Sequence, residues 1–410
     1  MKSNLKVENY PNLTKDTSTK YLKIINENKN NWENPFFTDT KTYIDFSKMD
    51  QALKEIAIEK LENIIVLGTG GSIQTLLSLK HLANKKIFPI TSSRSVELAN
   101  CLEKTDVSNS LIIPISRGGE TLDINSTIGI FAEKGYKFIG LSSQGTMYEI
   151  LKKMQCPILD VPDLSGRFAA SISNVAIFPA YVAGIEVDDF INGLEDGYQD
   201  YMNFELNDAS RIACYIYHLY TKGVKVVFSM PYSPNLEGSV GLFVQELSES
   251  TGKDNKGLMG AYQSAPLCQH SVLEYLLGGT KGAVIPILWI VEKDTVELRL
   301  TSEIDYINNK KAQEVINYQA HATFQALIEQ TVPSVLLTLP SPNAKNIGNL
   351  VSFIQSVVYY ICLLLDVNWA NNPKVVIGKQ ICNNALRKNQ SFEELKATRK
   401  KIGSDKFHNI

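Results

Sequence analysis

The stretch that most constrains the fold is the apolar run Asn63–Leu67, which leads into Gly68-Thr69-Gly70-Gly71-Ser72 and then a helical pattern. An uninterrupted β-branched run that ends in glycines is typical of a buried parallel strand turning into a helix. Backbone N–H groups at the start of a helix have no partner inside it, and glycines let an anion approach them. The stretch therefore predicts a buried strand followed by an anion site, with phosphate as the first candidate.

Chain length, net charge and cysteine spacing limit the number of domains and the class of ligand that can be expected. A length of 410 residues indicates two domains. The formal net charge of −2 gives no reason to expect nucleic acid or an anionic membrane as a partner, so a small soluble ligand is favoured. The 6 cysteines lie far apart without a CxxC pair, which indicates neither a zinc site nor a disulfide framework.

The cysteines, the N-terminal residues and the apolar run 356–365 indicate where in the cell the protein is found. We expect reduced cysteines, and hence a cytoplasmic protein. The first residues are not followed by an apolar segment, and the apolar run 356–365 is too short to span a bilayer. The sequence therefore predicts a chain that is neither exported nor embedded in a membrane.

Apolar strand-like runs alternate with helix-length segments in both halves of the chain. The predicted strands are 63–67, 87–90, 111–115, 137–141, 157–161, 224–229, 283–290 and 334–339. This rhythm predicts an α/β fold with two doubly wound parallel sheets, each covered by helices on both faces. We expect an N-terminal surface segment of one or two helices at 1–45, domains at 46–190 and 198–365, and a C-terminal helical tail at 366–410.

A second glycine turn strengthens the prediction of a phosphate site. The buried run Leu111–Ile115 ends in Ser116-Arg117-Gly118-Gly119-Glu120-Thr121 before another helical pattern. Parallel strands deliver their carboxyl ends to one edge of a sheet, so the hydroxyls and amides of both turns can surround one anion. A glycine turn that serves packing alone, and an Arg117 that lies free on the surface, remain alternatives.

The motifs of this chain resemble those of a known family. Ser-x-Gly-Gly-Glu-Thr at 116–121 resembles the sugar isomerase (SIS) domain, and further landmarks narrow the resemblance to the glucose-6-phosphate isomerase family. These landmarks follow the family order and are Gly68–Ser72, Asp163–Phe168, Val244–Lys253, Gln269–Ser271 and Val376–Gln380.

The resemblance implies a role for each matched residue. Glu249 would move a proton between C2 and C1 of an open-chain sugar phosphate, and Arg167 would stabilise the enediolate. His270 and Lys379 would open the sugar ring. Without the resemblance, Glu249 would be interpreted as a helix-capping glutamate and Arg167 as the partner of a carboxylate. The implied phosphate ligands are Gly70, Gly71, Ser72, Ser116, Arg117, Gly118, Gly119 and Thr121.

The resemblance also implies a homodimer, but it does not decide which sugar is the substrate. It implies a homodimer in which His270 reaches the neighbouring site, and chemistry that needs neither a metal nor an organic cofactor. The sequence departs from the family pattern near the expected ligand at Gly118, Glu120, Ser165, Ala169, Glu274 and Asn372.

The sequence therefore predicts an isomerase of glucose 6-phosphate and fructose 6-phosphate, active in glycolysis or gluconeogenesis. An isomerase of another phosphosugar with the same mechanism, and a non-catalytic sugar-phosphate sensor, are the alternatives.

Overall fold

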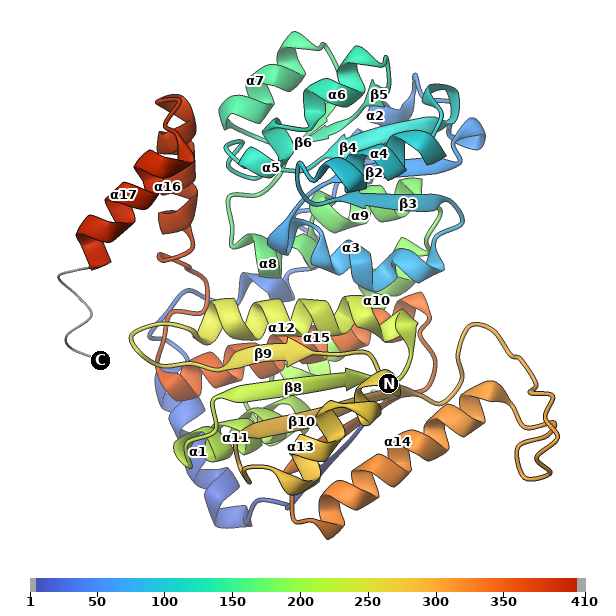
Figure 1. Ribbon diagram of the computed structural model, residues 1–410, viewed down its shortest axis with the longest axis vertical. Helices are drawn as coiled ribbons and strands as arrows, with labels where there is room; N and C mark the ends of the chain where they lie inside the picture. The colour runs from blue at the N-terminus through green and yellow to red at the C-terminus, as the bar shows by residue number, and fades with distance from the viewer. Residues whose placement is uncertain (1–4, 404–410) are drawn as a thin grey trace. The chain divides into compact units, whose positions relative to one another are not determined.

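The structure is a computed structural model that describes residues 5–403. Contacts divide the chain into two units, Met1–Ala370 and Asn371–Ile410, which are described separately. The first unit holds both sheets (Figure 1). The predicted borders at 190 and 198 lie inside this unit and stay predictions.

The first sheet has the strand order β3-β2-β4-β5, and all its strands are parallel. A short parallel pair, β6 and β7, continues it, because Ile115 bridges Leu141. The predicted strand 137–141 is therefore interrupted rather than continuous. The strands are β2 (Asn63–Leu67), β3 (Lys86–Ile90), β4 (Ser110–Pro114), β5 (Lys137–Phe138), β6 (Gly140–Leu141) and β7 (Ile158–Leu159).

Both faces of the first sheet are covered by apolar side chains. Along β2, Ile64 and Val66 join one hydrophobic cluster, whereas Ile65 and Leu67 join another. Successive side chains of a strand point to opposite faces, so this alternation means that both faces are buried. The helices of this half are α2 (Phe46–Leu53), α3 (Gln74–Leu79), α4 (Ser95–Lys104), α5 (Leu122–Asn125), α6 (Ile128–Glu133), α7 (Gly145–Lys153), α8 (Gly166–Ala169) and α9 (Asn174–Val182).

The second sheet has the order β1-β11-β10-β8-β9. Four of its strands are parallel, while β1 pairs antiparallel with β11. The N-terminal segment contains an expected helix, α1 (Lys15–Asn28), but also a strand that was not predicted, because Lys6–Tyr10 completes the sheet edge. The strands are β1 (Lys6–Tyr10), β8 (Val226–Pro231), β9 (Met259–Tyr262), β10 (Val284–Val291) and β11 (Ser334–Leu339).

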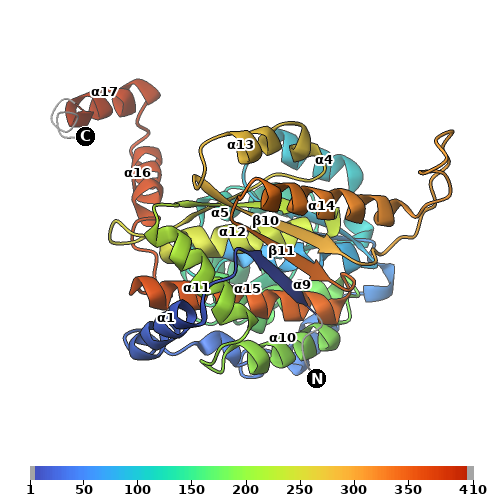
Figure 2. The same ribbon diagram turned by 90° about the horizontal axis from the view of Figure 1, so that it is seen from below.

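Helices also cover both faces of the second sheet, which confirms the predicted doubly wound α/β fold. Figure 2 shows α13 and α14 on one side of β10 and β11, and α11 and α15 on the other. Ile287 and Trp289 accordingly pack into one cluster, and Leu288 and Ile290 into another. The helices are α10 (Val187–Tyr201), α11 (Asp208–Thr221), α12 (Glu237–Thr251), α13 (Val272–Gly278), α14 (Ala312–Glu329) and α15 (Ala344–Leu365).

Two helices hold the halves of the first unit together. Helix α12 packs against α3 and α8 of the first half and against α15 and β9 of the second (Figure 1). Helix α15 extends the apolar run 356–365 to 22 residues. Within residues 5–403 it is the one helix long and apolar enough to cross a membrane, and it is fully buried in the protein core.

The second unit contains two helices, α16 (Val376–Arg387) and α17 (Phe392–Gly403). This agrees with a helical end of the chain. Residues 404–410 of the predicted tail lie outside the described residues.

Candidate functional site

The first glycine turn brings the end of β2 against α8. Gly70–Ser72 form a 3-10 turn before α3, and Gly70 has a φ of +58°. A Cβ atom on Gly71 would lie 2.5 Å from the backbone nitrogen of Arg167. Only glycine fits such an approach without movement of the backbone. The turn thus fixes the position of Arg167 next to the predicted phosphate-binding amides.

The second glycine turn places two hydroxyls together at the same sheet edge. Ser116 is buried, and its Oγ atom lies 3.1 Å from Oγ1 of Thr121. Gly119 has a φ of +69°, and a Cβ there would meet the carbonyl oxygen of Gln144 at 2.1 Å. Gly118 by contrast faces open space. Because β2 and β4 are neighbouring parallel strands, the two turns are adjacent, as predicted.

Two charged residues of the second turn have partners inside the protein. The Glu120 carboxylate accepts hydrogen bonds from the backbone nitrogen and Oγ1 of Thr146 at 2.8 and 2.7 Å, at the start of α7. Arg117 donates to the carbonyl oxygen of Leu164 and lies 4.0 Å from Asp163. The negative charge of Glu120 is therefore engaged by α7, and Arg117 is tied to the loop before α8.

Arg167 and Glu249 form an ion pair between α8 and α12. Nη1 of Arg167 lies 3.4 Å from Oε1 of Glu249, and their side chains are 3% and 18% exposed. Nε of Arg167 donates to Ser250 Oγ at 2.8 Å, and Nη2 donates to the carbonyl oxygen of Trp369. Gln245 donates to the other Glu249 oxygen at 3.1 Å. A partly accessible carboxylate therefore has a fixed orientation beside a buried cation.

Burial shifts the pKa of two cations at this position. It lowers the pKa of Arg167, and the attraction of Glu249 opposes that shift. Burial also lowers the pKa of Lys253 to about 8. The Lys253 ammonium donates to the carbonyl oxygen of Glu249 at 3.2 Å, so it caps the end of α12.

The reasoning from sequence missed two residues next to this pair, Gln245 and Glu246. Gln245 orients the Glu249 carboxylate, and Glu246 is completely buried one helical turn before it. The signal for Glu246 was its spacing, since it falls four residues after Leu242 and three after Phe243, both on the buried face of α12.

His270 and Lys379 belong to different units of the chain. His270 ends the 3-10 turn Leu267–His270 and is exposed, whereas its neighbour Gln269 points inward to Tyr232 and Thr323. Lys379 is exposed on α16, in the second unit. The roles implied for both residues stay predictions.

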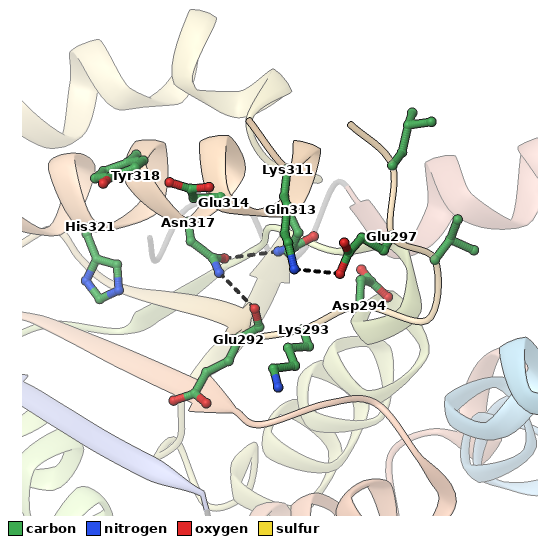
Figure 3. A pocket seen from close by; sticks show the side chains of 12 residues that line it. Glu292, Lys293, Asp294, Glu297, Lys311, Gln313, Glu314, Asn317, Tyr318 and His321 are labelled. Carbon is green, nitrogen blue, oxygen red and sulfur yellow. Dashed lines mark hydrogen bonds and ion pairs between the residues drawn. The ribbon is translucent and has the colours of Figure 1, made fainter. Parts of the chain in front are cut away.

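Two hollows lie at the carboxyl edge of the second sheet. Figure 3 shows the one between the segment after β10 and α14, of about 430 Å³. Its Lys311 is paired with Glu297 at 2.7 Å, and it contains none of the predicted site residues. The other, of about 600 Å³, lies between α3 and α12; its lining also contains none of the predicted site residues, but it includes Gln74 and Gln245. We prefer the second as the ligand cavity, because Gln245 contacts the Glu249 carboxylate.

The part of the chain that the structure describes contains no candidate metal site. No cluster of three or more His, Cys, Asp or Glu side chains occurs there. The site residues that lie together are two hydroxyls, glycine amides, one carboxylate and one guanidinium. This set can bind an anion and exchange a proton.

Two proteins that are similar to this chain in sequence are both glucose-6-phosphate isomerases, and each aligns with most of this chain. No protein-family model matches the chain. Over 340 residues it is 27% identical to a glucose-6-phosphate isomerase of Methanocaldococcus jannaschii, covering 78% of this chain and 83% of the relative. It is 28% identical over 352 residues to the glucose-6-phosphate isomerase of Mycoplasmopsis pulmonis, covering 78% and 82%.

A solved structure supports the same fold. The crystal structure of a glucose-6-phosphate isomerase from Chlamydia trachomatis matches with a TM-score of 0.79 at 15% identity, covering 98% of this chain and 92% of that one. At this level of identity the match establishes the two-sheet architecture.

Proposed function

We propose that this chain, which belongs to the glucose-6-phosphate isomerase family, interconverts glucose 6-phosphate and fructose 6-phosphate. The observation that carries the proposal is the ion pair between Arg167 and Glu249, 3.4 Å apart beside the first glycine turn. A base next to a fixed cation is what proton transfer through an enediolate requires.

Glu249 acts as the base in this proposal. Its carboxylate takes the proton from C2 of the open-chain aldose and returns it to C1, while the hydroxyl proton moves from O2 to O1, which converts the aldose into the ketose. Gln245 supports this role because it holds one carboxylate oxygen while the side chain stays partly exposed.

Arg167 stabilises the enediolate that forms when the C2 proton leaves. A guanidinium stays charged at every relevant pH and can hydrogen-bond to a negative oxygen. Contacts with Ser250, Trp369 and Glu249 hold the guanidinium in place, which reduces the reorganisation needed when charge develops on the substrate.

The sugar ring opens before proton transfer, and we assign this step to His270 and Lys379. An imidazole exchanges protons near neutral pH and therefore suits the ring oxygen or the anomeric hydroxyl. Because His270 is exposed in the single chain, we propose that it completes the site of a second copy in a homodimer.

The phosphate binds in the two glycine turns at the carboxyl edge of the first sheet. Side chains and amides both contribute, with Arg117 adding charge at the rim. The proposed ligands are Gly70, Gly71, Ser72, Ser116, Arg117, Gly118, Gly119 and Thr121. The reaction uses no metal and no organic cofactor, and we expect it in the cytoplasm.

Proton NMR of fructose 6-phosphate in heavy water with the purified protein tests the proposal. We expect glucose 6-phosphate to appear with deuterium at C2, because the abstracted proton exchanges with solvent. Enzyme-coupled assays with other phosphosugars run alongside. Turnover of another sugar alone would replace the substrate, and binding without turnover of any sugar would favour a sensor.

A further inference from the structure

Glu246 is a completely buried acid under the Arg167–Glu249 pair. It lies on the core face of α12, and its exposed fraction is 0%. Its Oε1 atom accepts a hydrogen bond from Nε2 of Gln355 at 2.9 Å. No partner reaches its Oε2 atom among the residues that the structure describes. A carboxylate here would have one hydrogen bond and no water, which disfavours the ionised form.

The orientation of Gln355 is fixed by hydroxyl groups on two other helical segments. Its Oε1 atom accepts from the Tyr198 hydroxyl and from Ser171 Oγ, the latter at 3.3 Å. An amide oxygen can only accept, so its Nε2 must face Glu246. The network therefore holds Glu246 in one position.

The titratable groups that act on Glu246 come from four helices, α8, α10, α12 and α15. Arg167 on α8 attracts it, and Glu249 on α12 repels it. Burial keeps Tyr198 on α10 and Cys362 on α15 neutral by raising their pKa, that of Cys362 to about 12. Lys253 lies beyond the end of α12 and interacts with Cys362. The pKa of Glu246 rises to about 8, mainly because the side chain is buried.

We propose that Glu246 is a positioning residue that, while neutral, leaves the charge of Arg167 to Glu249 and the enediolate. Once ionised, Glu246 competes for Arg167 and repels Glu249, so that the base and its cation lose their alignment. This inference rests on the proposed isomerase function.

The consequence is a loss of activity on the alkaline side. As the pH rises through the titration of Glu246, the neutral form disappears and kcat falls. We expect kcat to be about tenfold lower at about pH 9 than at about pH 7. Lys253 has a pKa of about 8 as well, so a variant must separate the two groups.

The variant Glu246→Gln keeps a neutral side chain of similar shape at every pH. We expect its kcat to change less than about twofold over the same interval. The exposed Glu329→Gln on α14 is the matched control and should titrate like the unchanged protein. An alkaline loss that persists in Glu246→Gln, at the same pH, would overturn the inference.

A second variant shifts the transition rather than removing it. Gln355→Leu deletes the hydrogen bond that lowers the pKa of Glu246. The alkaline loss should therefore move to higher pH, and an unchanged or lower midpoint in a folded variant would contradict the role of Glu246.

Infrared spectroscopy of the unchanged protein follows Glu246 without any enzyme assay. The difference spectrum between about pH 6 and about pH 10 should show the loss of a protonated carboxyl band that Glu246→Gln lacks. If the protein does not isomerise sugar phosphates but shows this band, the proposed function fails separately. If it isomerises them and the band is missing, the inference on Glu246 fails while the function stands.

Discussion

The carboxyl edge of the first sheet and the end of helix α12 offer a ligand different groups. After β2 and β4 the chain presents glycine amides and the paired hydroxyls of Ser116 and Thr121. The end of α12 presents Glu249, held by Arg167 and Gln245. Amides and hydroxyls bind an anion, whereas a carboxylate can also exchange a proton. In the proposed site, affinity and chemistry are thus carried by separate elements, and substitutions should separate KM from kcat.

The largest expected effect is on kcat when the base is removed. Glu249→Gln keeps the shape of the side chain and should lower kcat by about 10²–10⁴-fold, the usual contribution of a general base. Calorimetry should show fructose 6-phosphate binding within about threefold of the unchanged protein. If affinity falls as much as kcat, the division between the two elements is wrong.

The second effect is on the free energy of unfolding and concerns Glu246, the buried acid next to the proposed base. Glu246 has an ordinary pKa of 4.5 and a folded-state pKa of about 8. Between these values the folded state holds one proton more than the unfolded chain, so the free energy of unfolding falls as the pH rises. Glu246→Gln removes this loss and should gain on the order of a few kcal/mol at about pH 8 relative to about pH 4.5.

Urea unfolding of both proteins across that interval measures this gain. The difference between the two proteins should widen as the pH rises and level off above about pH 8. A constant difference would mean that Glu246 keeps its ordinary pKa in the folded protein.

A smaller effect is expected where the first glycine turn meets α8. In Gly71→Ala the new Cβ would lie 2.5 Å from the backbone nitrogen of Arg167. Overpacking of this kind costs about 1–3 kcal/mol. Gly118→Ala is the control for stability, because a Cβ there meets nothing within 4 Å. Equal unfolding temperatures for both variants would show that the close approach is absent.

An effect of similar size, but on substrate binding rather than on folding, is expected at the proposed phosphate-binding hydroxyls. Removing one hydrogen bond to a charged group costs about 1.5–3 kcal/mol, so Ser116→Ala should raise KM by roughly 10–100-fold. Its kcat should change less than about threefold, since Ser116 would contact no reacting carbon. Steady-state kinetics measure KM and kcat separately. A loss confined to kcat would mean that Ser116 takes part in proton transfer rather than in phosphate binding.

Strong local signals explain which parts of the fold could be predicted. Strands β2 and β4 are continuous apolar runs, because both faces of their sheet are buried. Strand β1 escaped prediction because Lys6–Tyr10 is polar and its register comes from pairing with β11. Strand β9 is a four-residue segment with a glycine and only one buried residue, so its sequence carries no strand pattern.

The contacts in the candidate site were harder to predict from the sequence than the strands. Arg167 and Glu249 lie 82 residues apart, and no spacing rule connects them. The resemblance implies that both residues act on one sugar phosphate but not that they pair, and the structure places their side chains 3.4 Å apart. Glu246 lies inside the matched segment 244–253, but the resemblance gave it no role, so only the helical period of α12 could have marked it as buried.

A crystal structure of Glu249→Gln with fructose 6-phosphate tests the central claim most directly. We predict the phosphate against Ser72, Ser116 and Thr121, with C1 and C2 within about 3–3.5 Å of the side chain at position 249. A phosphate bound away from both glycine turns, or sugar carbons out of reach of that side chain, would contradict the proposed site.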